Sequence, residues 1–379
     1  TRCVRRMRIQ PQNAHNPLMC DMLQWAKELT GPVVVHVHTQ KGKGYPFAER
    51  NPGKFHGIAP FDPQTGLTLQ PGGETFSSTF GKTLTDCAAE SEKVCAITAA
   101  MEDGTGLAVF AKAYPERLFD VGIAEGHAVS MAAGMAKQGM IPVFAVYSTF
   151  LQRSYDMLFH DVALQKLHVV LGVDRAGLVG ADGETHHGCL DISYLTGIPG
   201  FTVLCPSSLS ELRSMMRQAL FEIQGPVALR YPRGGEGHFT QDTGSQAVVR
   251  LRDGHQAVLV SYGILINQVL DAAERLERDG ISTRVVKLNR IAPLDTSALL
   301  RELDGADTVL VLENCFENGS IGQQIAALLA ESGRQCRQVI LQNLKDRFAP
   351  EGTVEQLQER FGLDADGVYR AVKEALSRE

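Results

Sequence analysis

The feature that most constrains the fold is a series of short, continuous apolar runs between residues 78 and 230. Their sequences are VCAITAA, PVFAVYS, LHVVLGVD, FTVLCP and PVALRYP. Segments with helical spacing, such as TFGKTLTDCAAE and LSELRSMMRQALFEI, lie between them. Apolar runs that do not alternate with polar residues are typical of parallel strands buried on both faces. The pattern therefore predicts a parallel sheet with helices on both sides.

The same alternation returns near the C-terminus with AVLVSYG, a helix ending at Gly280, STRVVKL and TVLVLEN. We therefore predict an α/β fold with two doubly wound sheet domains, at residues 78–235 and 251–379. The Pro- and Gly-rich segments 61–77 and 236–250 are interpreted as linkers. Residues 1–60 form a short leading fragment, in which we expect a helix over 13–30 and a buried strand at PVVVHVHT, followed by a Gly/Lys loop.

Composition is that of an ordinary globular protein, with 44% hydrophobic and 21% charged residues. The net charge of −6 argues against a nucleic-acid or anionic-membrane surface. No apolar run approaches the roughly 20 residues that cross a bilayer. The eight cysteines include no CxxC pair and are typical of a reducing compartment, so we expect a cytoplasmic protein without a zinc site.

In open parallel sheets, ligands bind beyond the carboxyl ends of the strands. The long polar loop from Arg175 to Gly188 follows one such strand, and Arg153 and Arg233 follow two others. Each arginine alone is explained as a surface ion-pair partner, but three at the strand ends of one sheet favour an anionic substrate, held by bidentate hydrogen bonds. A metal site at His186 and His187 is not favoured, because adjacent residues in an extended segment point in opposite directions.

Glu125 stands where a Gly/Ala-rich helix is expected to begin, with His127 close behind. An acidic residue at a helix N-terminus is favoured by the helix dipole and needs no function. Other chemistries lack their motifs, because the chain has no GxSxG elbow, no P-loop and no strand followed by GxGxxG.

Five segments, taken in order, closely resemble a known family. They are HTQKGKGY with KFHG, VGIAEGHAV, YSTFLQRSYD, DRAGLVGADGETHHG and RYPRG. They resemble the 1-deoxy-D-xylulose-5-phosphate synthases, thiamine-diphosphate enzymes of the transketolase superfamily. The resemblance implies decarboxylative condensation of pyruvate with D-glyceraldehyde 3-phosphate, which feeds isoprenoid, thiamine and pyridoxal biosynthesis. It also implies that residues 1–60 are the C-terminal remnant of a diphosphate-binding domain.

The resemblance also implies roles for individual residues. Glu125 would hydrogen-bond the aminopyrimidine of the cofactor, whose ring would stack on Phe150. Tyr45 would be a further cofactor contact, and His56 and His186 would move protons. The residues implied for acceptor-substrate binding are Tyr147, Arg153, Arg175, Asp182 and Arg233.

The chain departs from the family in the residues that hold Mg²⁺ and the diphosphate. It contains no GDG motif, and no asparagine lies between Asn51 and Asn267. We therefore expect Mg²⁺ to bind through an N-terminal domain outside this sequence, and the chain to be inactive alone. We expect a homodimer. The alternatives are a subunit of a split transketolase or a 2-oxo-acid dehydrogenase beta subunit, with the N-terminal domain on a separate chain, or a non-catalytic relic.

Overall fold

The computed structural model describes residues 17–58, 60–69, 73–334 and 336–377. The chain divides into two compact units, Thr1–Gly72 and Gly73–Glu379. The first part of the helix expected over 13–30 lies outside the described residues. Its described part is helix α1 (Pro17–Glu28).

In the described residues of the first unit, the helices are α1 and the short α2 (Pro46–Arg50). The buried strand predicted at residues 32–39 is wrong. Val34 is 84% exposed, and the segment belongs to no sheet of the described chain. A run of valines becomes a buried strand only when neighbouring strands take its backbone hydrogen bonds, and among the described residues Val33–Val35 pair with no strand.

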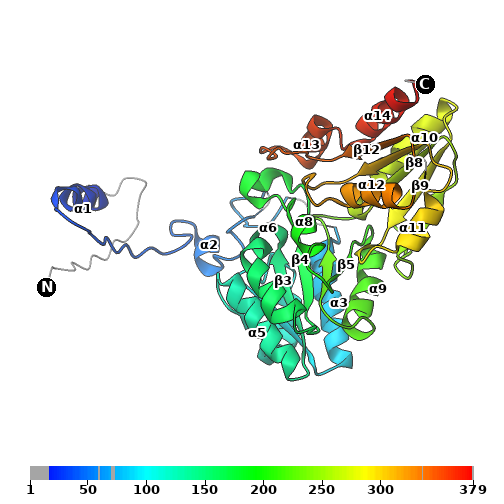
Figure 1. Cartoon of the computed structure of the whole chain (residues 1–379). Coiled ribbons are helices and arrows are strands. Elements are labelled where there is room, and N and C mark those ends of the chain that lie inside the picture. Colours follow the sequence, from blue (N-terminus) through cyan, green and yellow to red (C-terminus); the bar gives the residue numbers. More distant parts are fainter. Residues whose placement is uncertain (1–16, 59, 70–72, 335, 378–379) are drawn as a thin grey trace. The chain divides into compact units, whose positions relative to one another are not determined.

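The second unit begins with a seven-stranded sheet, in the order β10-β5-β6-β4-β3-β1-β2. Its strands β3, β4 and β5 are labelled in Figure 1. All neighbouring pairs are parallel except β10 with β5. The predicted apolar runs form its central strands, and the prediction of an α/β fold is confirmed. The strands are β1 (Val94–Thr98), β2 (Leu118–Asp120), β3 (Ile141–Tyr147), β4 (Val170–Asp174), β5 (Thr202–Leu204), β6 (Val227–Arg230) and β10 (Arg290–Ala292).

Helices cover both faces of this sheet. Helices α3 (Phe76–Glu90) and α9 (Leu209–Phe221) contribute to one apolar core with side chains such as Phe80 and Leu212. On the other face, α5 (Glu125–Lys137) and α8 (Asp191–Leu195) contribute Ala128 and Ile192 to a second core. The remaining helical segments are α4 (Ala108–Ala113), α6 (Ser148–Leu151), α7 (Tyr155–Met157) and a π-helix, Leu158–Ala163, with short 3₁₀ turns between them.

A five-stranded sheet follows, in the order β12-β11-β8-β9-β7. Only β7 is antiparallel to its neighbour. The strands are β7 (Val248–Arg252), β8 (Ala257–Ser261), β9 (Thr283–Leu288), β11 (Thr308–Leu312) and β12 (Gln338–Gln342). The helices are α10 (Ile266–Arg278), α11 (Thr296–Glu302), α12 (Ile321–Glu331), α13 (Val354–Phe361) and α14 (Ala365–Ser377). Two doubly wound sheets are thus present, as predicted.

The two sheets are not separate, however. Strand β10 follows β9 in the chain but pairs antiparallel with β5 of the first sheet, with Arg290 opposite Leu204. The larger apolar core also includes residues from both domains, for example Phe144 of β3 and Val311 of β11. The domain that begins after residue 250 therefore completes the sheet of the domain before it.

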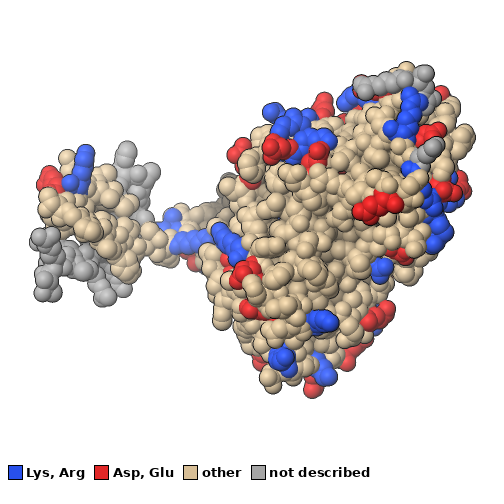
Figure 2. All heavy atoms as spheres, viewed as in Figure 1, with Lys and Arg blue, Asp and Glu red and all other residues tan. Residues whose placement is uncertain are grey.

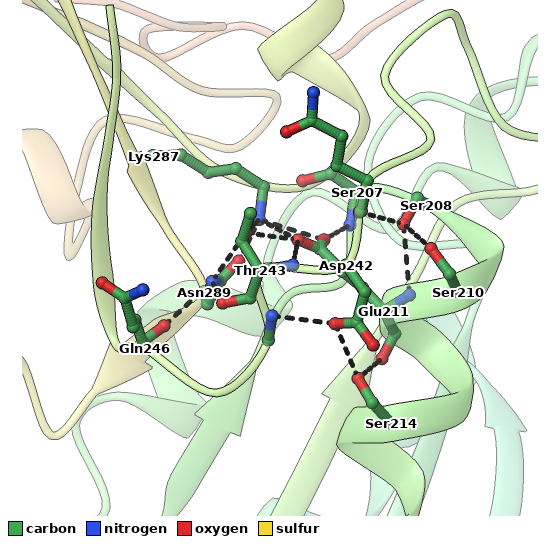
Figure 3. Close-up of polar contacts among 12 residues, drawn as sticks. Ser207, Ser208, Ser210, Glu211, Ser214, Asp242, Thr243, Gln246, Lys287 and Asn289 are labelled. Atoms are coloured by element: carbon green, nitrogen blue, oxygen red, sulfur yellow. Dashed lines mark hydrogen bonds and ion pairs between the residues drawn. The ribbon is translucent and has the colours of Figure 1, made fainter.

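A buried polar network, here called the junction network, lies where the segment that joins the domains meets both of them (Figure 3). Its centre is the ion pair of Glu211 on α9 with Lys287 on β9, both fully buried. The Lys287 Nζ lies 2.8 and 3.0 Å from the two Glu211 carboxylate oxygens. Those oxygens also accept hydrogen bonds from the backbone N–H groups of Ser207 and Thr243 and from the Thr243 hydroxyl. Lys287 also donates to Asn289. Burial lowers the pKa of Lys287, while Glu211 opposes that change.

Candidate active site at the strand ends

Glu125 is the first residue of α5, as the sequence predicted. Its side chain is only 4% exposed, and the Nη1 of Arg153 donates a hydrogen bond of 2.9 Å to its Oε1. Small buried residues along the same helix, Ala128 and Ala132, allow α5 to pack closely against the sheet. A carboxylate is therefore held at a helix N-terminus, where the dipole favours it, with a largely exposed arginine as its partner.

Tyr147 ends β3, and the chain turns at once into α6, which carries Phe150. The two rings stack with their centroids 5.9 Å apart. The Arg153 guanidinium lies 5.3 Å from the centre of the Phe150 ring. The turn from strand to helix thus brings these three residues together.

Arg175 follows β4 and joins the loop to the aromatic pair. Its guanidinium carbon lies 3.7 Å from the centre of the Tyr147 ring, and its Nη1 donates to the Gly104 carbonyl at 3.0 Å. Its backbone has a φ of +57°, a region that non-glycine residues seldom occupy. A side chain at Gly104 would collide with the Tyr147 hydroxyl, so this glycine leaves the room that the tyrosine occupies.

Asp182 lies between two of the three strand-end arginines. Its carboxylate is 3.0 Å from Arg233 and 3.7 Å from Arg175. Arg153 instead pairs with Glu125. The three arginines thus belong to one connected group, but only two of them share a carboxylate.

His186 contacts the aromatic pair through the Phe150 ring. Its ring lies 5.5 Å from that of Phe150 in an edge-to-face arrangement, and its Nδ1 is 2.9 Å from the Thr185 hydroxyl. Together these contacts connect eight residues of the second unit, here called the strand-end cluster. They are Glu125, Tyr147, Phe150, Arg153, Arg175, Asp182, His186 and Arg233.

Asp174 is a residue of this region that our reading of the sequence missed. It is the last residue of β4 and is fully buried. Burial raises its pKa to about 6, although Arg175 and a 2.7 Å hydrogen bond from the Ser77 hydroxyl oppose the change. Its Oδ1 has no hydrogen-bond partner. An acid at the end of an otherwise apolar strand, as in LGVD, was the available signal.

Tyr45 and His56 belong to the first unit. Tyr45 precedes α2, and its hydroxyl donates to the Pro63 carbonyl at 2.9 Å. Its ring lies 5.4 Å from that of Phe55 and 5.9 Å from that of Phe61. His56 is exposed. Tyr45 is thus packed among aromatic rings of its own unit.

Among the residues that the structure describes, no three His, Cys, Asp or Glu side chains are grouped so as to hold a metal ion. No described helix is long and apolar enough to cross a membrane. On the face of the second unit drawn in Figure 2, basic and acidic side chains are intermixed.

Two family models match the second unit. Residues 74–235 match the transketolase pyrimidine-binding domain, and residues 246–368 match the transketolase C-terminal domain. The chain belongs to the transketolase family. The first match contains the whole strand-end cluster, and the boundary between the two lies in the segment that contributes Thr243 to the junction network.

The curated relatives that the chain matches include 1-deoxy-D-xylulose-5-phosphate synthases. The chain is 44% identical over 377 residues to the 1-deoxy-D-xylulose-5-phosphate synthase 1 of Geobacter sulfurreducens, covering 97% of this chain and 59% of that protein. It is also 44% identical over 371 residues to the 1-deoxy-D-xylulose-5-phosphate synthase of Clostridium kluyveri, covering 96% of this chain and 59% of that protein. This member of the transketolase family thus spans about three fifths of the length of these relatives.

Solved structures give the same fold. A split-gene transketolase, described as an inactive beta4 tetramer, matches with a TM-score of 0.72 and 29% identity, over 80% of this chain and 99% of its own. The transketolase of Campylobacter jejuni matches with a TM-score of 0.68 and 18% identity, over 79% of this chain and 46% of its own. At that identity the second match supports the fold alone.

Proposed function

We propose that this chain forms the pyrimidine-binding and C-terminal parts of a 1-deoxy-D-xylulose-5-phosphate synthase. The enzyme would condense pyruvate with D-glyceraldehyde 3-phosphate and release carbon dioxide, in the cytoplasm, for isoprenoid, thiamine and pyridoxal biosynthesis. The observation that carries the proposal is the strand-end cluster, where a buried carboxylate, two stacked aromatic rings and three arginines are joined at one edge of the sheet. The 44% identity to curated synthases supports the choice of reaction.

The residues present fit one half of thiamine diphosphate. A buried carboxylate on a helix N-terminus suits a hydrogen bond to a ring nitrogen, and the partly exposed Phe150 ring suits stacking of an aminopyrimidine. The described residues include no cluster suited to Mg²⁺. We propose that Mg²⁺ and the diphosphate bind through an N-terminal domain outside this sequence, because the sequence contains no GDG motif.

When bound, thiamine diphosphate supplies the electron sink for decarboxylation. Glu125 would hold or move the proton at the pyrimidine ring nitrogen, and Phe150 would orient that ring. Tyr45 of the first unit would be a further cofactor contact.

Substrate binding falls to the other cluster residues. Arg175 and Arg233 would bind the phosphate of the acceptor. Their guanidinium groups would then contact both this phosphate and the Asp182 carboxylate. Arg153 and Tyr147 would orient the acceptor. His186, and His56 of the first unit, would transfer protons.

A second candidate is the C-terminal subunit of a split transketolase, whose N-terminal domain is a separate chain. It is favoured by the similarity to a split-gene transketolase chain, which this chain covers almost completely. In both candidates we propose a homodimer of this chain as the core of the assembly.

The test is to supply the missing part in trans. We would mix the purified chain with the N-terminal segment of the Geobacter sulfurreducens synthase, thiamine diphosphate and Mg²⁺, and measure carbon dioxide release with pyruvate and D-glyceraldehyde 3-phosphate. Activity is expected in the mixture and not with either part alone. Glu125→Gln should lower kcat by about 10²-fold or more, whereas Lys137→Gln, at the exposed end of the same helix, should leave it unchanged. Ketol transfer between sugar phosphates without pyruvate would instead support the split transketolase. Absence of both activities would count against both candidates.

A further inference from the structure

His187 neighbours a cluster residue but makes different contacts. The backbone N–H of Val179 lies 3.2 Å from its Nδ1, and the carbonyl of Pro350 lies 3.1 Å from its Nε2. A carbonyl only accepts and a backbone N–H only donates. Both hydrogen bonds are made together only when Nε2 carries the ring proton and donates it to the Pro350 carbonyl, so that Nδ1 is unprotonated and accepts from the Val179 N–H.

The Val179 end of this link leads directly to the strand-end cluster. Val179 precedes the 3₁₀ turn Gly180–Asp182, and its carbonyl accepts a hydrogen bond of 3.4 Å from Arg233. Arg233 in turn pairs with Asp182. His187 therefore fixes the backbone three residues before Asp182.

The Pro350 end belongs to the C-terminal domain, whose backbone approaches the loop closely. A side chain at Gly180 would come within 3.2 Å of the Gly352 carbonyl oxygen and the Val354 nitrogen. A side chain at Gly177 would collide with Asn314. The two glycines allow the loop to lie against this domain.

Elsewhere the contact between loop and domain is incomplete. A cavity of about 290 Å³ lies between Glu184, Thr185 and Leu190 of the loop side and Leu344 and Phe348 of the C-terminal domain. His187 is at its wall. The two hydrogen bonds of His187 thus connect the loop to the C-terminal domain beside a cavity that apolar side chains do not fill.

We propose that His187 is a positioning residue, through which the C-terminal domain holds the loop 175–188 in the conformation that presents Asp182 and Arg233. It touches neither substrate nor cofactor. The consequence for acceptor binding rests on the proposed function, whereas the consequence for the loop backbone does not.

The first test therefore needs no activity. His187→Leu keeps the approximate size of the side chain and removes both hydrogen bonds, whereas His187→Gln retains one acceptor and one donor. Hydrogen exchange of the full chain should show the amides of 176–186 exchanging about tenfold faster or more in His187→Leu. Exchange in His187→Gln should be close to wild type. His160→Leu, which replaces an exposed histidine of the π-helix, is the control and should not change it. Unchanged exchange in His187→Leu would overturn the proposal, as would equal acceleration throughout the C-terminal domain.

The second test uses the reconstituted enzyme. His187→Leu should raise the KM for D-glyceraldehyde 3-phosphate about tenfold, with little change in kcat or in the KM for pyruvate, and His187→Gln should restore it. Equal losses for both substrates would contradict a positioning role. If the mixture turns over neither substrate, the proposed function fails, and the exchange experiment still decides the role of His187. If His187→Leu does not fold, His187→Phe, which also removes both hydrogen bonds, takes its place: faster exchange confined to 176–186 supports the link, and wild-type exchange with a wild-type KM refutes it.

Discussion

The junction network and the strand-end cluster are both built from carboxylates paired with cationic side chains, but they differ in how completely these groups are hydrogen-bonded. In the junction network, both oxygens of Glu211 and the ammonium of Lys287 are fully buried and bonded. Next to the strand-end cluster, the buried Oδ1 of Asp174 accepts no hydrogen bond, and the Arg175 guanidinium lies 3.7 Å from it. Within the cluster, the Nε of Arg175 makes no hydrogen bond and lies 3.7 Å from the Asp182 carboxylate. Buried polar atoms are nearly always bonded. The Glu211–Lys287 pair is therefore fully satisfied, although the Ser207 hydroxyl beside it has no hydrogen-bond partner, while the second region keeps unused bonding capacity on its charged groups.

The strongest test of this comparison is to break the closed network. Lys287→Met leaves Glu211 as an unpaired buried charge, which we expect to lower the free energy of unfolding by about 3–5 kcal/mol. Urea denaturation measures it. The double variant Lys287→Met/Glu211→Gln removes that charge and should be less destabilised than Lys287→Met alone. A loss below about 1 kcal/mol in the single variant, or no recovery in the double one, would show that the network is not closed as described.

Asp174 gives the matching test for the incompletely hydrogen-bonded region around the strand-end cluster. Its pKa is raised from its ordinary value of 3.8 to about 6, because burial penalises the ionised form. The folded chain therefore binds this proton more tightly than the unfolded chain. The contribution to stability is complete below pH 3.8 and is lost as the pH rises through about 6.

At 1.36 kcal/mol per pH unit the full effect is about 3 kcal/mol. Asp174→Asn should remove it, so the stability of the wild type relative to this variant should fall as the pH rises from 3.8 to about 6. Denaturation at closely spaced pH values in both proteins measures the difference. A difference that stays constant would mean that the pKa is the same in both states, and one that grows with pH would mean that the ionised form is the one stabilised; either result contradicts the expectation.

Substitution of Gly104 tests how tightly the side chains of the strand-end cluster are packed. Gly104→Ala would displace the Tyr147 hydroxyl, and with it the surface on which Arg175 stacks. We expect a loss of about 1–3 kcal/mol. Gly134→Ala in α5, where an added Cβ meets no atom within 4 Å, is the matched control and should stabilise the chain by about 0.5–1 kcal/mol. Equal effects of the two changes on thermal unfolding would contradict the tight contact.

The smallest expected effect is that of Arg175→Lys. Lysine keeps the positive charge but loses the flat stacking on Tyr147, worth about 0.5–1 kcal/mol at a partly exposed site. Urea denaturation should detect it in wild type and not in a Tyr147→Leu background. A loss above about 2 kcal/mol would indicate that Arg175 is as firmly fixed as Lys287.

The sequence predicted those elements whose burial depends on their own composition. Runs such as PVFAVYS and TVLVLEN became central strands, because a strand buried on both faces must be apolar throughout. The short or edge strands β2, β7, β10 and β12 were not predicted. PVVVHVHT was predicted to be a buried strand and is not one, since burial also requires partners that the run itself does not contain.

The candidate site divides in the same way. Residues attached to motifs, such as Glu125 and Asp182, were named from the sequence, and the roles assigned to them remain predictions. Asp174 and Lys287 were missed, although a lysine inside STRVVKL is a visible departure from an apolar strand. What no local pattern contains is the partner of such a residue, since Glu211 is 76 positions away from Lys287.

Strand β10 has a consequence for how this protein can be recombined. Because Arg290–Ala292 completes the sheet of the preceding domain, the two domains are not interchangeable modules despite their separate family matches. A chimera that takes its C-terminal domain from another member of the transketolase family also imports the edge strand of the first sheet, and with it the residue at position 287 opposite a resident Glu211. We therefore expect a crossover between the two domains to be tolerated only where donor and recipient match at the β10–β5 pairing and at the Glu211–Lys287 ion pair. The two domains should accordingly be exchanged together rather than singly.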